Sequence, residues 1–370
     1  MTDRFRAGII GAGFMGTVHA HATRAAGGIV SKIAASAPAG AARAAERVHA
    51  EASAASAEEL IDADDVDIVH ICTPNHLHAQ FAELALKAGK HVVCEKPLAT
   101  TVADAKRLAR MAADIGVVAA VPFVYRYYPT VREARARIAG DSSNPLWLLH
   151  GSYLQDWLSN RDDLNWRVDP RLGGSSRAFA DIGVHWCDLM EFTTGHRITA
   201  LTARMLTAHP ERHDGSDVLP VGTEDGATVL FETDRGASGS VVVSQASPGR
   251  KNRLWFSFDG ISTSYSFDQE LPESLWVGGR AENRLVTRAP DTLSDGAREY
   301  AWLPGGHPQG YQDCFNAFVA DVHAAAAGRT PDGLPQFGDG HRAATLTSAV
   351  IRSGETRAWV EVGVDAEKEP

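Results

Sequence analysis

The sequence predicts an α/β protein in two parts: a doubly wound parallel sheet, then an α+β domain built on a large, mainly antiparallel open sheet. Short apolar runs alternate with helical segments over roughly the first 125 residues. A glycine-rich turn joins the first run to the first helix, and beyond residue 123 strand-like segments separated by turn residues take over. We therefore expect one domain over residues 1–124 and a second over residues 125–370.

The overall composition narrows the class of protein. A net charge of −10 over 370 residues argues against a nucleic-acid partner. No apolar run reaches the roughly 18 residues of a membrane span, and no signal-peptide pattern precedes the first strand. Four dispersed cysteines in apolar settings read as reduced core residues: Cys72, Cys94, Cys187 and Cys314. We expect a cytoplasmic protein with no membrane partner and no metal.

The first element is a buried strand over residues 6–10, followed by a G-x-G-x-x-G motif and a helix over 17–26. Gly11 allows the tight turn, Gly13 lets a pyrophosphate approach the backbone, and Gly16 allows close packing of helix on strand. The free N–H groups of the helix N-terminus suit phosphates. The motif therefore predicts a Rossmann-type dinucleotide site, against the plainer reading of an ordinary strand–helix turn; it comprises Gly11, Ala12, Gly13, Phe14, Met15 and Gly16.

The second strand, over residues 30–35, bears on the choice between NAD and NADP. An acidic residue usually follows this strand when the cofactor has a free ribose 2′-hydroxyl. Here Ser36 stands in its place, and the next carboxylate is Glu46 in the following helix. Ser36 could bond a 2′-phosphate, with Arg43 as the nearest basic candidate. We therefore expect NADP, or the use of both cofactors, over NAD alone.

The third strand, over 67–72, ends in a polar loop at the carboxyl edge of the sheet, where such folds bind ligands. Thr73 and Asn75 are expected to line the nicotinamide ribose. His76 and His78 are two residues apart, which is poor spacing for two metal ligands on one helix face. A helix over 79–88 follows.

The fourth strand, over 92–94, stops at Glu95-Lys96-Pro97 because proline restricts itself and the residue before it. Lys96 is therefore held just past the carboxyl end of a strand, where a partly desolvated lysine can take part in proton transfer. The plainer alternative is a surface lysine in a loop. A helix over 102–115 and a strand over 117–121 complete the domain.

The second half reads as antiparallel strands with a few helices. Helices are expected over 129–139, 180–194, 309–326 and 338–353, and strands over 147–155, 199–208, 227–233, 238–245, 254–259, 263–267 and 285–288. An open apolar face of such a sheet is usually covered by another subunit. We expect a homodimer or homotetramer formed through this sheet.

The chemistry of the second half centres on the segment that begins at Asp181. On an α-helix, Asp181, His185 and Asp188 share one face. Asp181 can then orient the imidazole of His185, which exchanges protons near neutral pH. A carboxylate at a helix N-terminus beside a buried histidine is the structural alternative.

Aromatic and polar residues before this helix suit a sugar, whose ring has apolar faces and hydroxyl edges. Core aromatics are the alternative reading. The segments are Tyr153-Leu154-Gln155-Asp156-Trp157 and Asn165-Trp166-Arg167, and His307 in a later loop could edge the same pocket.

Taken together, these motifs resemble the Gfo/Idh/MocA family of NAD(P)-dependent oxidoreductases. The resemblance rests on the glycine motif, Thr73-Pro74-Asn75-His76-Leu77-His78, the Glu95-Lys96-Pro97 block with its lead-in, Tyr125-Arg126, and Asp181-x-Gly-x-His185. It implies that Lys96, Asp181 and His185 are catalytic. The aromatic segments are similar to those of members that act on levoglucosan. The absence of an acidic residue at position 36, where this chain has Ser36, resembles the NADP-using members.

The residues expected at the cofactor are Gly11, Gly13, Phe14, Met15, Gly16, Ser36, Thr73, Pro74, Asn75, His78, Glu95, Lys96, Arg126, Trp166 and Arg167. Those expected at the substrate are Lys96, Tyr125, Tyr153, Gln155, Asp156, Trp157, Asp181, His185 and His307.

The expected activity is hydride transfer between a secondary alcohol of a cyclic sugar or polyol (a pyranose, anhydrosugar or inositol) and NAD(P). His185, alone or with Lys96, takes the hydroxyl proton, and Lys96 stabilises the developing alkoxide. Two alternatives on the same scaffold are an NAD-dependent, redox-neutral glycosidase and a non-catalytic nucleotide-binding sensor.

Overall fold

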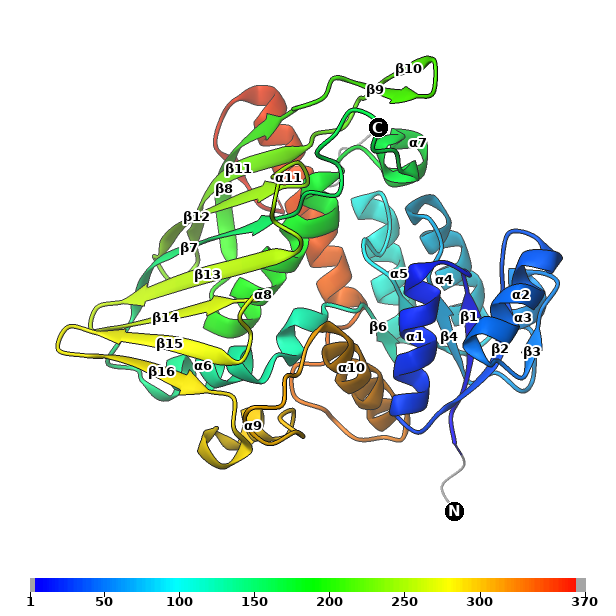
Figure 1. Cartoon of the computed structure of the whole chain (residues 1–370), viewed down its shortest axis with the longest axis horizontal. Coiled ribbons are helices and arrows are strands. Elements are labelled where there is room, and N and C mark those ends of the chain that lie inside the picture. The colour runs from blue at the N-terminus through cyan, green and yellow to red at the C-terminus, as the bar shows by residue number, and fades with distance from the viewer. Residues whose placement is uncertain (1–3, 364–370) are drawn as a thin grey trace. The chain divides into compact units, whose positions relative to one another are not determined.

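A computed structural model describes residues 4–363, which fold into two compact units (Figure 1). The first unit runs to Val124 and includes Tyr311–Ala344, and the second comprises Tyr125–Gly310 and the residues from Thr345 onward. We expected a second domain continuous from 125 to 370, but the chain instead returns to the first unit for residues 311–344.

The first unit is a six-stranded parallel sheet in the order β3-β2-β1-β4-β5-β6, as expected for a Rossmann fold. Most of its strands are fully or largely buried because helices flank them. They are β1 (Arg6–Ile10), β2 (Ile29–Ala34), β3 (Ala52–Ser53), β4 (Ile68–Ile71), β5 (His91–Cys94) and β6 (Ala119–Ala120). The helices are α1 (Phe14–Ala25), α2 (Pro38–Val48), α3 (Ala57–Ile61), α4 (His78–Lys87), α5 (Val102–Ile115) and α10 (Tyr311–Ala326), with a short 3-10 turn η1 (Asn75–Leu77).

Packing against α1 explains why α10 belongs to the first unit. The ring of Phe315 lies 5.1 Å from that of His19 on α1, and Gln312 donates to the carbonyl of Val18 at 3.3 Å. This apolar and polar contact buries one side of α1. The sequence pattern of α10 shows a buried face but does not say which element covers it.

The second unit is built on a nine-stranded sheet in the order β16-β15-β14-β13-β7-β12-β11-β8-β17. Neighbouring strands are antiparallel except for the parallel pair β7–β12. The strands are β7 (Leu146–Leu154), β8 (Ile198–Leu206), β11 (Gly226–Thr233), β12 (Ser238–Ser244), β13 (Arg253–Gly260), β14 (Thr263–Asp268), β15 (Ser274–Gly279), β16 (Asn283–Thr287) and β17 (Val360–Glu361).

The remaining elements complete the chain. A separate hairpin, β9 (Glu211–Asp214) with β10 (Asp217–Pro220), was not expected, and neither were β15 and β17. The helices are α6 (Pro129–Gly140), α7 (Pro170–Gly173), α8 (Val184–Thr194), α9 (Asp295–Arg298) and α11 (Phe337–Thr356), whose residues are divided between the two units. Short turns are η2 (Val124–Tyr127), η3 (Trp166–Val168), η4 (Phe179–Gly183) and η5 (Pro290–Thr292).

The two faces of the large sheet differ in burial. On one face α6 and α8 cover the strands (Figure 1), and Trp186 of α8 packs on Phe231 and Phe258. On the other face, apolar side chains of central strands stay exposed, including Leu230 and Val242. This is the alternation of a sheet with one buried and one open face.

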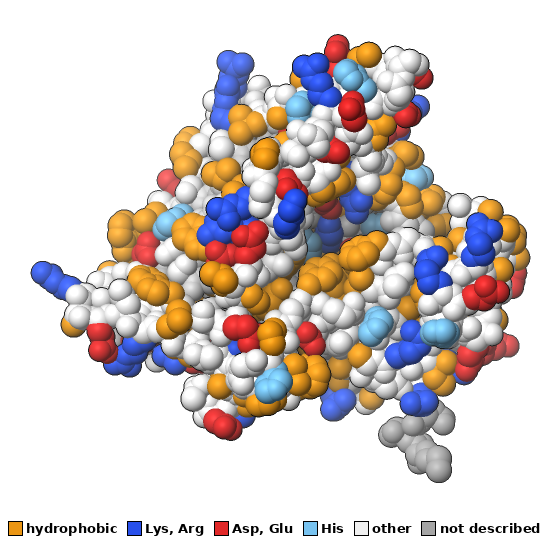
Figure 2. Space-filling model, viewed as in Figure 1, with side chains coloured by type: hydrophobic (Ala, Val, Ile, Leu, Met, Phe, Trp, Pro, Cys, Tyr) orange, Lys and Arg blue, Asp and Glu red, His pale blue; other side chains and the backbone are white. Residues whose placement is uncertain are grey.

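The surface and the helices add two further observations. On the face drawn in Figure 2, Lys and Arg side chains are interspersed with Asp and Glu. None of the helices within residues 4–363 is long and apolar enough to cross a bilayer.

Candidate active site

The glycine loop between β1 and α1 has the backbone that its motif demands. Gly11 has φ +121°, and a Cβ there would lie 2.4 Å from the carbonyl oxygen of Cys72. A Cβ on Gly16 would lie 2.0 Å from the carbonyl oxygen of Gly11. Any larger residue would therefore push the helix away from the strand.

Gly13, by contrast, faces open space, since a Cβ there would have no atom within 4 Å. It is the N-cap of α1 and makes no side-chain cap, so the first N–H groups of the helix remain available. An open approach to free N–H groups fits a pyrophosphate. The neighbouring Phe14 is 72% exposed, and Met15 lies beside the hydroxyl of Tyr311 at 4.0 Å.

At the end of β2, Ser36 is exposed and no carboxylate occupies the adjoining positions. The basic group that reaches the glycine loop is Arg47, whose guanidinium donates to the carbonyl of Ala12 at 2.5 Å. Sequence reasoning named Arg43 and missed Arg47. Only the fold of α2 back over the loop brings Arg47 there.

The Thr-Pro-Asn loop after β4 is tied to the Glu-Lys-Pro loop by His78. Its ring nitrogens lie 2.9 Å from the carbonyl of Thr73 and 2.7 Å from that of Pro97. Burial lowers the pKa of His78 more than these carbonyls raise it. His78 was expected at the cofactor, but its ring is buried and occupied with two backbone groups. It acts as a link between the two loops.

One buried group in this loop is unsatisfied. The Thr73 hydroxyl has no hydrogen-bond partner among the described residues. Because a buried hydroxyl without a partner costs stability, a bound ribose or amide would satisfy it. Asn75 follows, largely buried, at the start of η1.

Lys96 and Glu95 follow β5 directly, as expected. The Lys96 side chain is partly exposed, whereas Glu95 is only 6% exposed and points into the unit. One Glu95 oxygen lies 3.0 Å from Nε2 of His19, and the other accepts the backbone N–H of Lys96 at 3.2 Å. Glu95 was expected at the cofactor; its carboxylate instead holds protein groups.

In the second unit, the segment around Asp181 departs from the expected single helix. Residues Phe179–Gly183 form a π-helical turn before α8 begins at Val184. The buried carboxylate of Glu224 accepts the backbone N–H groups of Arg177 and Phe179 at 3.1 and 2.9 Å. This anchor explains the wider turn, a feature frequent at functional sites. The turn that carries Asp181 is therefore wider than the α-helix on which the shared face of Asp181 and His185 was predicted.

Asp181 is held from two sides. Gln245 donates its amide to Oδ2 at 2.7 Å, and Nε of Arg167 lies 3.5 Å from Oδ1. The Arg167 guanidinium stacks 4.3 Å above the ring of Trp166. The structure thus brings Arg167, which stacks on Trp166, beside Asp181, a grouping that their distance in the sequence did not reveal.

His185 lies among the expected tyrosines. Its ring centre is 5.0 Å from Tyr125 and 6.3 Å from Tyr153, and the two tyrosine hydroxyls bond each other. Asn252 joins this cluster by accepting from Tyr153 and from the Gln155 amide, both at 2.7 Å. Sequence reasoning missed Asn252, for which no local signal exists.

The other expected substrate residues vary in their surroundings. Trp157 donates its indole N–H to Gln155 at 2.8 Å. Asp156 binds Lys251 at 2.7 Å, and this hydrogen bond lowers the pKa of Asp156. His307 has an exposed side chain, and its carbonyl accepts from Arg288 at 2.5 Å.

Arg126, expected at the cofactor, is instead buried in a bidentate ion pair with Asp188 of α8. Nε lies 2.8 Å from Oδ2, and the guanidinium stacks 5.0 Å from the ring of Phe192. The pair fixes η2, and with it Tyr125, to α8.

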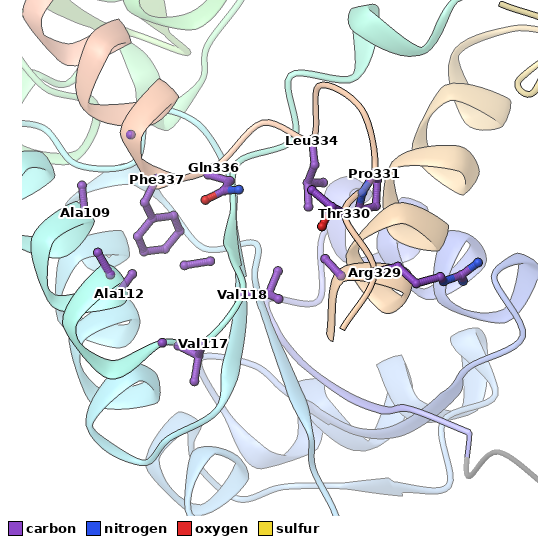
Figure 3. A pocket seen from close by; sticks show the side chains of 15 residues that line it. Ala109, Ala112, Val117, Val118, Arg329, Thr330, Pro331, Leu334, Gln336 and Phe337 are labelled. Carbon is purple, nitrogen blue, oxygen red and sulfur yellow. The ribbon is translucent and has the colours of Figure 1, made fainter. Parts of the chain in front are cut away.

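A cavity of about 390 Å³ lies elsewhere in the first unit (Figure 3). It opens beside Gly116 and Val118, which precede β6, and therefore lies at the edge of the parallel sheet opposite the glycine loop. Arg329 is the one charged group among the described residues that line it. With no carboxylate or histidine in its described lining, it offers no acid–base chemistry.

Comparison with known proteins assigns both halves of the chain to the same family. Residues 5–123 match the model described as oxidoreductase family, NAD-binding Rossmann fold. Residues 131–263 match the GFO/IDH/MocA C-terminal domain.

Several relatives are similar over most of their length. Levoglucosan dehydrogenase of Pseudarthrobacter phenanthrenivorans is 32% identical over 96% of this chain and 97% of its own. D-apiose dehydrogenase of Paraburkholderia graminis is 30% identical over 79% of this chain and 74% of its own. A solved levoglucosan dehydrogenase in complex with NADH and levoglucosan superposes with a TM-score of 0.91 at 32% identity, covering 97% of this chain and 99% of that one.

Proposed function

The chain belongs to the Gfo/Idh/MocA family of oxidoreductases, and on that premise we propose that it is an NAD(P)-dependent dehydrogenase of cyclic sugars or polyols. The structural observation that carries the proposal is the cluster around His185. A titratable imidazole lies beside two aromatic rings whose hydroxyls, with Asn252 and Gln155, form a polar edge. Aromatic faces next to hydrogen-bonding groups suit a sugar ring.

Each catalytic residue has a separate chemical task. His185 accepts the proton of the reacting hydroxyl, and Asp181, held by Gln245, supports the imidazole. Lys96 supplies positive charge to the alkoxide that develops as the proton leaves. The bound nicotinamide supplies the acceptor for the hydride.

The glycine loop and the unsatisfied Thr73 hydroxyl support the binding of a dinucleotide. Phe14 and Met15 belong to that loop, and Pro74 and Asn75 extend the Thr73 segment. For the ribose, the exposed Ser36 and the position of Arg47 favour NADP or the use of both cofactors.

Replacing Lys96 by Met tests the activity. Turnover of a sugar panel, followed by the absorbance of reduced nicotinamide, should fall by at least about 100-fold because the charge opposite the alkoxide is lost. Calorimetry should still detect nucleotide binding. Lys87→Met, a surface lysine of the same unit, is the control. Unchanged turnover in Lys96→Met would refute the assignment, and release of a reducing sugar without net reduction would indicate the glycosidase.

The Ser36→Asp variant tests the cofactor preference. Added negative charge should repel a 2′-phosphate and shift the efficiency ratio toward NAD. Ser216→Asp, an equal charge change in an exposed turn of the second unit, should leave the ratio unaltered. An unaltered ratio in Ser36→Asp itself would rule out a position of Ser36 beside the ribose.

We also propose that a second copy of the chain covers the open face of the large sheet, giving a homodimer or homotetramer. Leu230 and Val242, on adjacent strands, are 54% and 42% exposed there. Leu230→Glu should lower the mass measured by light scattering, whereas Leu271→Glu, in an exposed turn outside the sheet, should not. The free cysteines support a reducing, cytoplasmic location.

A further inference from the structure

Behind Lys96 lies a chain of three buried titratable side chains, His70, His19 and Glu95, here termed the histidine chain. Nδ1 of His70 on β4 lies 2.9 Å from Nδ1 of His19 on α1. Nε2 of His19 lies 3.0 Å from Oε1 of Glu95. Both rings are fully buried, and the chain links three separate elements of the first unit.

The contact between the two Nδ1 atoms fixes where the protons lie. Two lone pairs would repel and two N–H groups would clash, so one proton lies between the rings. If both histidines are neutral and Glu95 is ionised, His70 donates from Nδ1, and His19 donates from Nε2 to Glu95. The alternative places a full positive charge on His19 and an N–H on Nε2 of His70.

The second arrangement is unfavourable because Nε2 of His70 has no hydrogen-bond partner among the described residues. It would leave a buried N–H donor unpaired, whereas the first leaves only a lone pair. Burial also lowers the pKa of His70, which disfavours a further arrangement with the positive charge on His70. The neutral arrangement therefore gives a directed chain that ends on the carboxylate.

Glu95 completes the link to the loop. Burial raises the pKa of Glu95, but the hydrogen bond from His19 and the charge of Lys96 act the other way and the pKa is lowered overall, so the carboxyl stays ionised. Its second oxygen accepts the backbone N–H of Lys96 at 3.2 Å. The orientation of the carboxylate thus constrains the residue that carries the lysine.

We propose that His19, backed by His70, is a positioning residue that orients Glu95 and thereby fixes the backbone from which Lys96 projects. The inference rests on the proposed function, because it assigns His19 a task in service of Lys96. It also gives α1, the helix of the glycine loop, a direct connection to the lysine loop.

Other titratable groups surround the histidine chain and enter its response to pH. Burial, and then the charge of Glu95, raises the pKa of the thiols of Cys72 and Cys94. The groups that face the chain are Cys72 after β4, Cys94 of β5, His78 of α4, Lys96, and His323 of α10.

The decisive variant is His19→Leu, measured as kcat against pH. Loss of the donor should lower kcat by about tenfold or more, in the range seen when supporting residues are removed. It should also add a new rise of kcat with pH, because loss of the hydrogen bond from His19 raises the pKa of Glu95 and lets the carboxylate take up a proton as the pH falls. His21→Leu, an exposed histidine two residues along the same helix, should change neither.

Two further variants separate positioning from mere support of the fold. His19→Gln keeps an amide donor near Nε2 and should recover most of kcat without the new pH dependence. His19→Leu combined with Glu95→Gln should lose the pH dependence while kcat stays low, because no carboxyl remains to titrate. A flat pH profile in His19→Leu alone would overturn the proposal.

A readout independent of turnover uses the wild-type chain with 15N-labelled histidine. Nitrogen shifts should identify neutral His19 protonated on Nε2 and neutral His70 protonated on Nδ1. A positively charged His19 at neutral pH would overturn the proton placement and the proposal with it.

The same experiments distinguish failure of the proposal from failure of the proposed function. If wild type turns over no sugar, the proposed function fails while the nitrogen shifts still test the chain. If Lys96→Met loses turnover but His19→Leu keeps the kcat and pH profile of wild type, only the positioning role fails. A loss of nucleotide affinity in His19→Leu with kcat retained would likewise overturn it.

Discussion

Each unit buries a carboxylate close to one of its own candidate catalytic residues, but the two carboxylates are neutralised differently. In the first unit, Glu95 meets a histidine, His19, and one backbone N–H. In the second unit, Asp225 meets two fully buried arginines, Arg177 and Arg212, the latter at 2.8 Å, as well as the backbone N–H groups of residues 208 and 209.

The difference lies in the partner's response to pH. Arginine stays charged at every pH a protein meets, whereas histidine changes its protonation near neutral pH. Burial raises the pKa of Asp225, but backbone hydrogen bonds and Arg177 more than offset it. Arg177 also donates to Gln245, which holds Asp181. The second unit therefore supports Asp181 through charged arginines, and the first supports Lys96 through a hydrogen bond from a neutral histidine.

The largest expected effect comes from a variant that breaks the arginine network around Asp225. Asp225→Asn leaves two buried arginines without their counter-ion, which should cost about 3–5 kcal/mol in the free energy of unfolding. Urea unfolding followed by tryptophan fluorescence is the measurement, because all eight tryptophans lie in the second unit. Glu282→Gln removes an exposed ion pair with Arg284 and should cost less than about 1 kcal/mol. Equal costs for the two variants would contradict the comparison.

An intermediate effect comes from pH. Burial lowers the pKa of several first-unit histidines below the 6.5 expected of an unfolded chain: His70, His78, His91, His323 and His341. These groups stay neutral when folded, so their stabilising contribution is complete above pH 6.5 and declines as the pH falls below it, where the unfolded chain binds more protons. Glu95, whose pKa is also lowered, adds a loss of the same sign at lower pH.

In the second unit, burial also lowers the pKa of His196. Acidification below pH 6.5 should therefore shift the urea midpoint measured by far-ultraviolet circular dichroism, which reports both units, more than the midpoint measured by tryptophan fluorescence. Coincident shifts by the two probes would show that the units lose stability together.

The smallest expected effect comes from removing a helix cap in the first unit, which compares the same two probes at constant pH. Thr101 caps α5 by accepting the N–H of Asp104 at 3.1 Å, so Thr101→Ala should cost about 1 kcal/mol. The urea midpoint measured by circular dichroism should therefore fall more than the urea midpoint measured by tryptophan fluorescence. Thr100→Ala, an exposed neighbour outside the cap, is the control and should leave both midpoints unchanged.

Much of the fold could be predicted from local patterns in the sequence. The strand–glycine–helix order of the first unit and the alternating strands of the second depend on neighbours in sequence, and the structure confirms them. What depended on distant residues was not predictable. The π-helical turn at Asp181 needs Glu224, and the sheet position of β15 needs β14 and β16 on either side.

The residues of the candidate site divide in the same way, into those placed by the local sequence and those placed by distant residues. The positions of Gly11, Gly16, Lys96 and His185 follow from residue type and position relative to a strand or helix. The buried roles of His78, Glu95 and Arg126 do not, because a polar side chain in a loop motif gives no sign of which way it points. Asn252 and Arg47 are brought in by tertiary packing alone.

The return of Tyr311–Ala344 to the first unit bears on how the protein is made. A ribosome releases the N-terminus first, and domains usually fold as they emerge. Here the side of α1 that packs against Phe315 is covered only by α10, which is synthesised after residues 125–310 of the second unit. Neither unit therefore has all of its strands and helices until the last part of the chain is synthesised, because the first needs Tyr311–Ala344 and the second needs the end of α11 and β17.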